Sequence, residues 1–129
     1  MEALLEPTRI YVKCLLPLLK ANLVSAMAHI TGGGLVENIP RVLPADMMVR
    51  IKEGSWDMPP VFQWLFGLNV VPPADLWRTF NCGIGMVLVV SEEDADEVIE
   101  SLAAFGEVGA KVIGVVEACA AGDEQVIIE

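Results

Sequence analysis

The sequence is poor in the side chains that build metal centres. Its 129 residues include one histidine, His29, and three cysteines, Cys14, Cys82 and Cys119, which lie far apart and form no C-x-x-C pair. A structural zinc site needs four such ligands at short spacings, so we predict no metal site. Three unpaired thiols suit a reducing compartment, and we interpret them as small buried hydrophobic residues.

Positive charge is also scarce. Eight lysines and arginines stand against 18 aspartates and glutamates, which gives a formal net charge of −10. Such a field repels phosphate backbones, so we expect neither nucleic acid nor an anionic membrane as a partner. A single phosphorylated metabolite is still compatible as a ligand, because a local loop can bind it despite the repulsion that the net negative charge of the protein exerts.

Long hydrophobic runs are missing too, although 54% of the residues are hydrophobic. No apolar run approaches the ~18 residues of a membrane span. The first residues, Met1–Pro7, have neither the basic start nor the apolar stretch of a signal peptide. We therefore expect a cytoplasmic protein, and one domain with a sizeable core at this length.

Apolar periodicity and turn residues predict alternating helices and strands. The predicted helices are Val12–Ala21, Leu35–Leu43, one that Pro59-Pro60 opens and that runs through Leu65 or Phe66, one that Pro72-Pro73 opens and that runs to about Thr79, and Glu92–Phe105. The predicted strands are Leu23–Ile30, Met47–Ile51, Gly85–Val90, Lys111–Ala118 and Gln125–Ile128. The last two strands are expected to form a closing hairpin. Ser91 is expected to be the N-cap of the predicted helix Glu92–Phe105, in a capping box with Asp94. This order indicates an α+β fold, a layered α/β sandwich with one mixed sheet.

The segment Thr31-Gly32-Gly33-Gly34 lies between a predicted strand and a predicted helix. Glycines let backbone N–H groups approach an anion closely, and the first N–H groups of a helix have no partner of their own. The segment is thus a candidate phosphate-binding loop, with Asn38 and Arg41 as supporting donors. Such loops also often only turn the chain, and Glu37 competes for the same helix dipole.

His29 lies on the predicted strand immediately before this loop. A lone histidine in an apolar strand is more often a packed, hydrogen-bonded residue than a catalyst. The neighbouring candidate anion site makes a catalytic role worth testing. A second cluster, Asn81–Gly85, lacks the third glycine of a dinucleotide-binding fingerprint. We expect Gly83 and Gly85 to mark a close approach of another part of the backbone or, as the alternative, of a ligand.

The stretch Ala28–Pro44 resembles the signature of aminoimidazole ribonucleotide synthetases. It reads Ala-His-Ile-Thr-Gly-Gly-Gly-Leu, then Val, then Glu-Asn-Ile-Pro-Arg-Val-Leu-Pro. Further blocks agree in order: Pro7–Lys13, Pro59–Leu65, Arg78–Met86 and Ile113-Gly114. The resemblance covers nearly the whole chain and implies helices packed on a mixed, mainly antiparallel sheet.

The resemblance also implies a function. Enzymes of this family use ATP to phosphorylate the formyl-amide oxygen of formylglycinamidine ribonucleotide; an internal nitrogen then closes the ring. By resemblance, His29 is a candidate for polarising the amide or moving a proton, and Thr31, Gly32, Gly33, Gly34, Asn38 and Arg41 are candidates for holding a phosphate of substrate or ATP. We therefore expect a cyclo-ligase of purine biosynthesis.

In the family, an N-terminal domain carries most of the ATP and Mg²⁺ site and forms the homodimer. We expect residues 1–129 to be the C-terminal domain alone, with residues 1–11 as a leading segment and the ATP-binding domain absent. The chain by itself should then be inactive. Two alternatives remain open: a related ATP-using enzyme of the same superfamily, and a non-catalytic module that binds an anionic metabolite.

Overall fold

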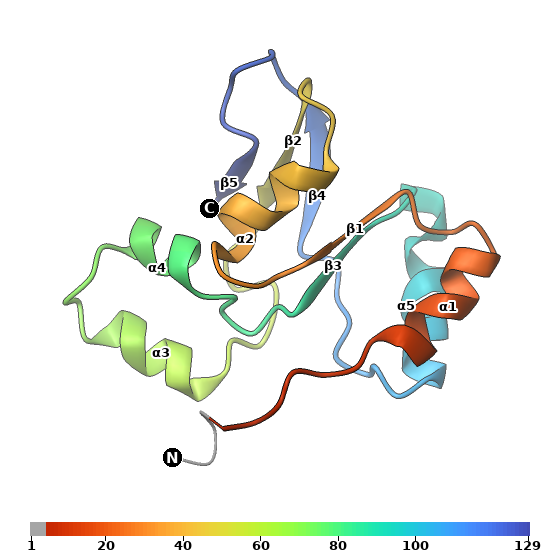
Figure 1. Cartoon of the computed structure of the whole chain (residues 1–129), viewed down its shortest axis with the longest axis horizontal. Helices are drawn as coiled ribbons and strands as arrows, with labels where there is room; N and C mark the ends of the chain where they lie inside the picture. The colour runs from red at the N-terminus through yellow and green to blue at the C-terminus, as the bar shows by residue number, and fades with distance from the viewer. Residues whose placement is uncertain (1–4) are drawn as a thin grey trace.

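The computed structural model describes residues 5–129 as an α+β layered sandwich (Figure 1). The α-helices are α1 (Val12–Lys20), α2 (Gly34–Asn38), α3 (Pro60–Gly67), α4 (Pro73–Thr79) and α5 (Ala95–Ala104), joined by 3₁₀ turns η2 (Ile39–Val42) and η3 (Glu92–Asp94). The strands are β1 (Ala26–His29), β2 (Met47–Ile51), β3 (Met86–Val89), β4 (Gly114–Ala118) and β5 (Val126–Ile128). Every predicted strand contains one of these strands.

The strands form two sheets, whereas the sequence predicted one. β1 and β3 make an antiparallel pair, with His29 opposite Met86. The second sheet has the order β4-β2-β5. The runs Leu23–Ile30 and Gly85–Val90 are therefore in one sheet and Lys111–Ala118 in the other.

The predicted closing hairpin is wrong. β4 pairs antiparallel with one edge of β2 and β5 pairs parallel with the other, so the chain crosses from edge to edge between them. Gln125 anchors this crossing, because its side-chain amide donates to the carbonyls of Pro44 and Met47, both at 2.8 Å. The short turn between β4 and β5 looks like a hairpin turn in the sequence, and nothing near it shows that β2 lies between these two strands.

Two predicted helix boundaries also change. The predicted helix Leu35–Leu43 is a short α2 followed by η2, because Pro40 has no N–H to continue the helical ladder. Ser91 precedes η3 rather than an α-helix, and its side chain makes no capping hydrogen bond. The expected capping box with Asp94 is therefore not formed, and α5 begins at Ala95.

Two hydrophobic cores share the β1–β3 pair. Side chains alternate along a strand, so Ala28 and Val87 face the larger core, which β2, α2 and α4 also line. Met86 and Leu88 face the smaller core beneath α1 and α5. Figure 1 shows α1 beside α5 at one end of the molecule, far from α3 and α4. Within residues 5–129, no helix is long and apolar enough to cross a membrane.

A tight turn at Asn81–Ile84 joins α4 to β3 and buries Cys82. The Ile84 N–H donates to the Asn81 carbonyl at 2.9 Å, and both central residues have positive φ, 51° at Cys82 and 95° at Gly83. These are the features of a type I′ turn. The buried Trp56 indole N–H donates to the Cys82 carbonyl at 2.9 Å, which ties the turn to the larger core.

Burial raises the pKa of the Cys82 thiol to about 12, with a smaller contribution from Glu53. The unfolded thiol ionises near 9.0, so between these values the folded state binds more protons than the unfolded state. The free energy of unfolding should therefore fall as pH rises from 9 toward 12. Urea midpoints of wild type and Cys82→Ala measured at about pH 8 and about pH 11 test this. The drop should be smaller in the variant, and equal drops would contradict the prediction.

Candidate functional site

The predicted glycine loop connects β1 to α2, and its backbone conformation requires glycine at two positions. Gly33 has φ of 99° and Gly34 has φ of 58°, both in the left-handed region. At Gly34 a side chain is also excluded by space, because a Cβ there would lie 2.1 Å from the Trp77 carbonyl oxygen. The loop is thus packed directly on the end of α4.

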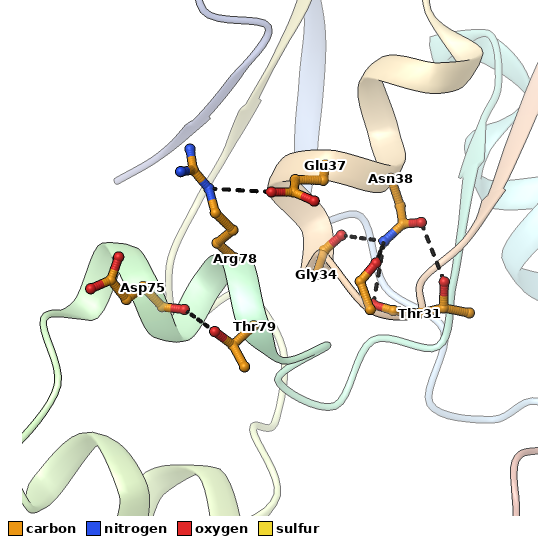
Figure 2. A network of polar contacts seen from close by, with 8 residues as sticks. Thr31, Gly34, Glu37, Asn38, Asp75, Arg78 and Thr79 are labelled. Atoms are coloured by element: carbon orange, nitrogen blue, oxygen red, sulfur yellow. Dashed lines mark hydrogen bonds and ion pairs between the residues drawn. The ribbon is translucent and has the colours of Figure 1, made fainter.

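Asn38 holds the loop from inside. It is the one buried polar side chain among the described residues, with 4% of its surface exposed. Its amide nitrogen lies 3.3, 3.2 and 2.8 Å from the carbonyl oxygens of Thr31, Gly32 and Gly34 (Figure 2). The Thr31 hydroxyl donates to the Asn38 carbonyl oxygen at 3.4 Å. Both Asn38 N–H groups are therefore engaged with loop carbonyls, so Asn38 shapes the loop.

Holding the loop carbonyls inward leaves backbone donors free. The Gly34 N–H bonds the Thr31 carbonyl and the Glu37 N–H bonds the Gly33 carbonyl, each at 3.1 Å. The remaining N–H groups of the loop and helix start find no hydrogen-bond acceptor within residues 5–129. These N–H groups belong to Gly32, Gly33, Leu35 and Val36. Free N–H groups at such a turn are suited to an anionic oxygen.

Glu37 folds back over the same loop. A Cβ built on Gly33 would lie 2.7 Å from a Glu37 carboxylate oxygen, so the carboxylate rests against the loop backbone. The Arg78 side chain from α4 pairs with Glu37 at 3.6 Å, and both side chains are about half exposed (Figure 2). The ion pair is therefore weak and exchangeable. An arriving anion would compete with Glu37 for the loop and could gain Arg78.

Glu37→Gln should strengthen phosphate binding to this loop several-fold, because it removes the competing carboxylate and frees Arg78. The measurement is a titration of the amide signals of Gly32 and Gly33 with inorganic phosphate. Glu100→Gln, on the distant α5, is the matched control, since it changes net charge equally. An equal gain in both variants would mean that only the global charge matters.

His29 is exposed at the end of β1, on the same face of the β1–β3 pair as Met86, and it lies beside Tyr11. The two ring centroids are 6.0 Å apart in an edge-to-face arrangement. The Tyr11 hydroxyl in turn lies against Gly85, where a Cβ would approach it to 1.9 Å. Gly85 is thus required to admit Tyr11, and the Gly85 carbonyl accepts the Ile30 N–H at 2.9 Å. Burial raises the pKa of Tyr11, so its hydroxyl stays protonated near neutral pH.

The predicted residues fall into three groups. Thr31, the glycines and Asn38 form one loop, as Figure 2 shows in part. His29 lies two residues before the loop and makes no hydrogen bond to it within residues 5–129. Arg41 is exposed in η2, and its guanidinium has no ion pair among the described residues.

No role was predicted from the sequence for Arg78 or Tyr11. Arg78 approaches the loop only because α2 packs on α4. For Tyr11 one signal existed: the glycine at position 85, in a strand where a larger residue would otherwise pack better. Two hollows lie elsewhere, of about 370 Å³ around Trp56 and Phe66 and about 540 Å³ between Arg50 and Val112.

The fold and the loop define an α+β sandwich domain with a glycine-rich connection from strand to helix at its surface. The family described as AIR synthase related protein, C-terminal domain, matches residues 1–127. The chain therefore belongs to this family. The resemblance found in the sequence is confirmed at this level.

The residues present fit one part of an ATP and Mg²⁺ site but not the other. The free loop N–H groups are suited to a phosphate oxygen. Within residues 5–129, however, no three side chains of the kind that bind metals come together. Mg²⁺ prefers carboxylate oxygens and water, so this part of the chain offers no obvious Mg²⁺ cage.

Proposed function

We propose that this chain is the C-terminal domain of the ATP-dependent cyclo-ligase that converts formylglycinamidine ribonucleotide to aminoimidazole ribonucleotide in purine biosynthesis. The observation that carries the proposal is the Asn38-braced glycine loop with its free N–H groups. The family match over residues 1–127 supports it. ATP and Mg²⁺ would be bound mainly by an N-terminal domain, which would also form the homodimer in the cytoplasm.

In this proposal the loop binds and orients a phosphate group. Four N–H groups of the loop and helix start have no hydrogen-bond acceptor in the described residues, and Asn38 binds the adjoining loop carbonyls. The loop is therefore preorganised, so little ordering has to occur when the anion arrives. Arg78 supplies a movable positive charge at the loop. Arg41 is a second exposed cation, in η2, three residues after Asn38.

His29 would act on the reacting amide. Its imidazole is exposed, so a substrate can reach it, and the Tyr11 ring restricts its orientation from one side. A histidine in this position can donate a hydrogen bond to the amide oxygen or accept the proton released when the ring closes. The glycine loop begins two residues further on, which allows phosphate and reacting group to be held by one segment.

The test is reconstitution. This chain is mixed with a separately produced N-terminal half of an aminoimidazole ribonucleotide synthetase, ATP, Mg²⁺ and formylglycinamidine ribonucleotide, and product formation is followed. We expect no turnover from this chain alone and turnover from the mixture, because in-line phosphoryl transfer needs nucleotide and metal positioned together. Turnover by the chain alone would overturn the proposal.

A second outcome separates the alternatives. If the mixture is inactive but the isolated chain binds the substrate nucleotide at the loop, a non-catalytic anion-binding module becomes the better description. If the mixture acts on ATP with a different phosphate acceptor, the chain belongs to another enzyme of the superfamily. Thiamine phosphate and selenide are the acceptors to include.

A further inference from the structure

β4 forms an edge of its sheet and carries exposed hydrophobic side chains. Among residues 5–129, it pairs with β2 on one side and with no strand on the other. Val115 is 55% exposed, Val116 39%, and Val112, just before the strand, 59%. An exposed apolar edge strand is a template for pairing with another strand.

The open side of β4 can be assigned residue by residue. The Lys52 N–H donates to the Ile113 carbonyl, and the Cys119 N–H donates to the Asp46 carbonyl. Backbone groups alternate in direction along an antiparallel pair, so the groups of Ile113, Val115 and Glu117 point toward β2. Those of the intervening residues point away from the sheet; these are Val112, Gly114, Val116 and Ala118.

The edge lacks the usual protection against pairing. Proline is absent from residues 111–118, and the charged residues there, Lys111 and Glu117, stand at the two ends. The opposite edge of the same sheet, β5, has three residues, and its Val126 is buried. β4 is thus the edge of this sheet that can accept a partner strand.

We propose that β4 pairs with β4 of a second copy of this chain, antiparallel and two-fold symmetric about Gly114. In this register Lys111 of each copy lies opposite Glu117 of the other, and Val112 lies opposite Val116. Two cross-strand pairs of opposite charge and four apolar pairs form at once, the apolar ones being Val112 opposite Val116 and Ile113 opposite Val115, each twice. Each pair is of a kind that stabilises antiparallel strands. The outward groups of Gly114 and Val116 meet outward groups of the partner strand, as the ladder requires.

The intramolecular contacts of the two charged residues do not prevent this. Lys111 pairs with Asp57 at 2.8 Å, and Glu117 pairs with Arg50 at 3.4 Å. All four side chains are at least one third exposed. Exposed pairs contribute little and can be shared or exchanged. The two three-stranded sheets would become one continuous six-stranded sheet.

The surface beside β4 can accommodate the partner. Val112, Ile113 and Val115 line a hollow of about 540 Å³ with Arg50 and Lys52. In the proposed register, Val115 of the partner lies opposite Ile113, one of the residues that line this hollow. Apolar surface that water now covers would then be shared between the two copies. This inference is independent of the proposed enzymatic function.

The first test is the concentration dependence of sedimentation. We expect weak self-association, with a dissociation constant on the order of 0.1 mM, because the contact is small and both copies are acidic. Hydrogen exchange should slow with concentration at Gly114 and Val116, whereas Val115 and Glu117 are already bonded to β2. A monomer over the range up to about 1 mM would overturn the proposal.

A charge-exchange experiment tests the register. Lys111→Glu places Glu opposite Glu twice in the dimer, and Glu117→Lys places Lys opposite Lys twice. Each variant alone should self-associate about tenfold more weakly than wild type. An equimolar mixture of the two should associate again, because each heterodimer has two attractive pairs.

The matched controls are Lys20→Glu and Glu100→Lys, which alter net charge equally on α1 and α5. Their mixture should gain no association beyond what lower net repulsion gives any such mixture. Recovery limited to the β4 variants supports the register. Association that is unaffected by the β4 variants, or equal recovery in the control mixture, would overturn the proposal. Either result would place the contact elsewhere, for example on the exposed Trp64 of α3.

A third variant, Val116→Pro, removes a backbone N–H that points away from β2 and leaves the bonds to β2 intact. It should also give a monomer.

Discussion

Gly34→Ala should destabilise the domain by about 3 kcal/mol or more, a large part of the roughly 5–15 kcal/mol that holds a domain of this size. The new Cβ would lie 2.1 Å from the Trp77 carbonyl oxygen and 2.6 Å from that of Phe80. Both are backbone atoms at the end of α4, so relief requires the helix itself to move. The φ of 58° at Gly34 adds strain for any residue with a Cβ.

The neighbouring Gly32 provides the control for the effect of an added methyl group in this loop. A Cβ at Gly32 would meet nothing within 4 Å, so Gly32→Ala should leave stability nearly unchanged. Urea unfolding of wild type and the two variants measures the difference. If Gly34→Ala were as stable as Gly32→Ala, the packing of α2 on α4 would not be as tight as the geometry indicates.

Gly33→Val should block the approach of an anion to the loop, because the added side chain lies beside the loop N–H groups. The structure adds two costs, since φ is 99° and the Cβ would meet the Glu37 side chain at 2.7 Å. Gly32→Val is the better variant for testing anion binding, because a Cβ at Gly32 meets no described atom within 4 Å and the side chain adds bulk beside the loop N–H groups.

The strands could be predicted because each is a short apolar run bounded by turn residues. Their pairing could not be predicted in the same way. Lys111–Ala118 and Gln125–Ile128 are adjacent in sequence and separated by a turn at Gly122, which is the pattern of a hairpin. What prevents the hairpin is β2, a strand more than sixty residues earlier, whose two edges bind both. A local sequence pattern gives no information on such competition from a distant strand for the same pairing partners.

The candidate site shows a similar division. The position of the glycine loop follows from the sequence, because a strand, glycines and a helix succeed one another. The direction of side chains does not follow. Asn38 was expected to face a ligand, yet it turns toward three loop carbonyls. Burial explains the difference, because a buried amide must satisfy its donors inside the protein.

The His29 neighbourhood links two sequence blocks that lie far apart. Tyr11 comes from the segment before α1 and Gly85 immediately precedes β3, yet the Tyr11 hydroxyl lies against Gly85 and its ring lies beside His29. The ring therefore limits the positions open to the imidazole. Tyr11 is in this view a positioning residue, and its effect on the reaction should be smaller than that of His29.

His29→Ala should lower kcat of the reconstituted enzyme by about 10²–10⁴-fold, the usual loss when a general acid or base is removed. Phosphate binding by the isolated chain should not change, because the loop N–H groups do not depend on the imidazole. Product formation and amide titrations measure the two effects separately. Full activity of reconstituted His29→Ala would remove the histidine from the mechanism.

Tyr11→Phe distinguishes positioning from catalysis. It keeps the ring beside His29 and removes only the hydroxyl, so kcat should fall by less than about tenfold if the ring alone orients the imidazole. Gly85→Ala should lower kcat further, because its methyl group must displace the Tyr11 hydroxyl and with it the ring. If Tyr11→Phe lowered kcat as strongly as His29→Ala, with an altered pH profile of kcat, the hydroxyl itself would take part in proton transfer. If Gly85→Ala had no effect on kcat, the contact between Tyr11 and His29 would be structural only.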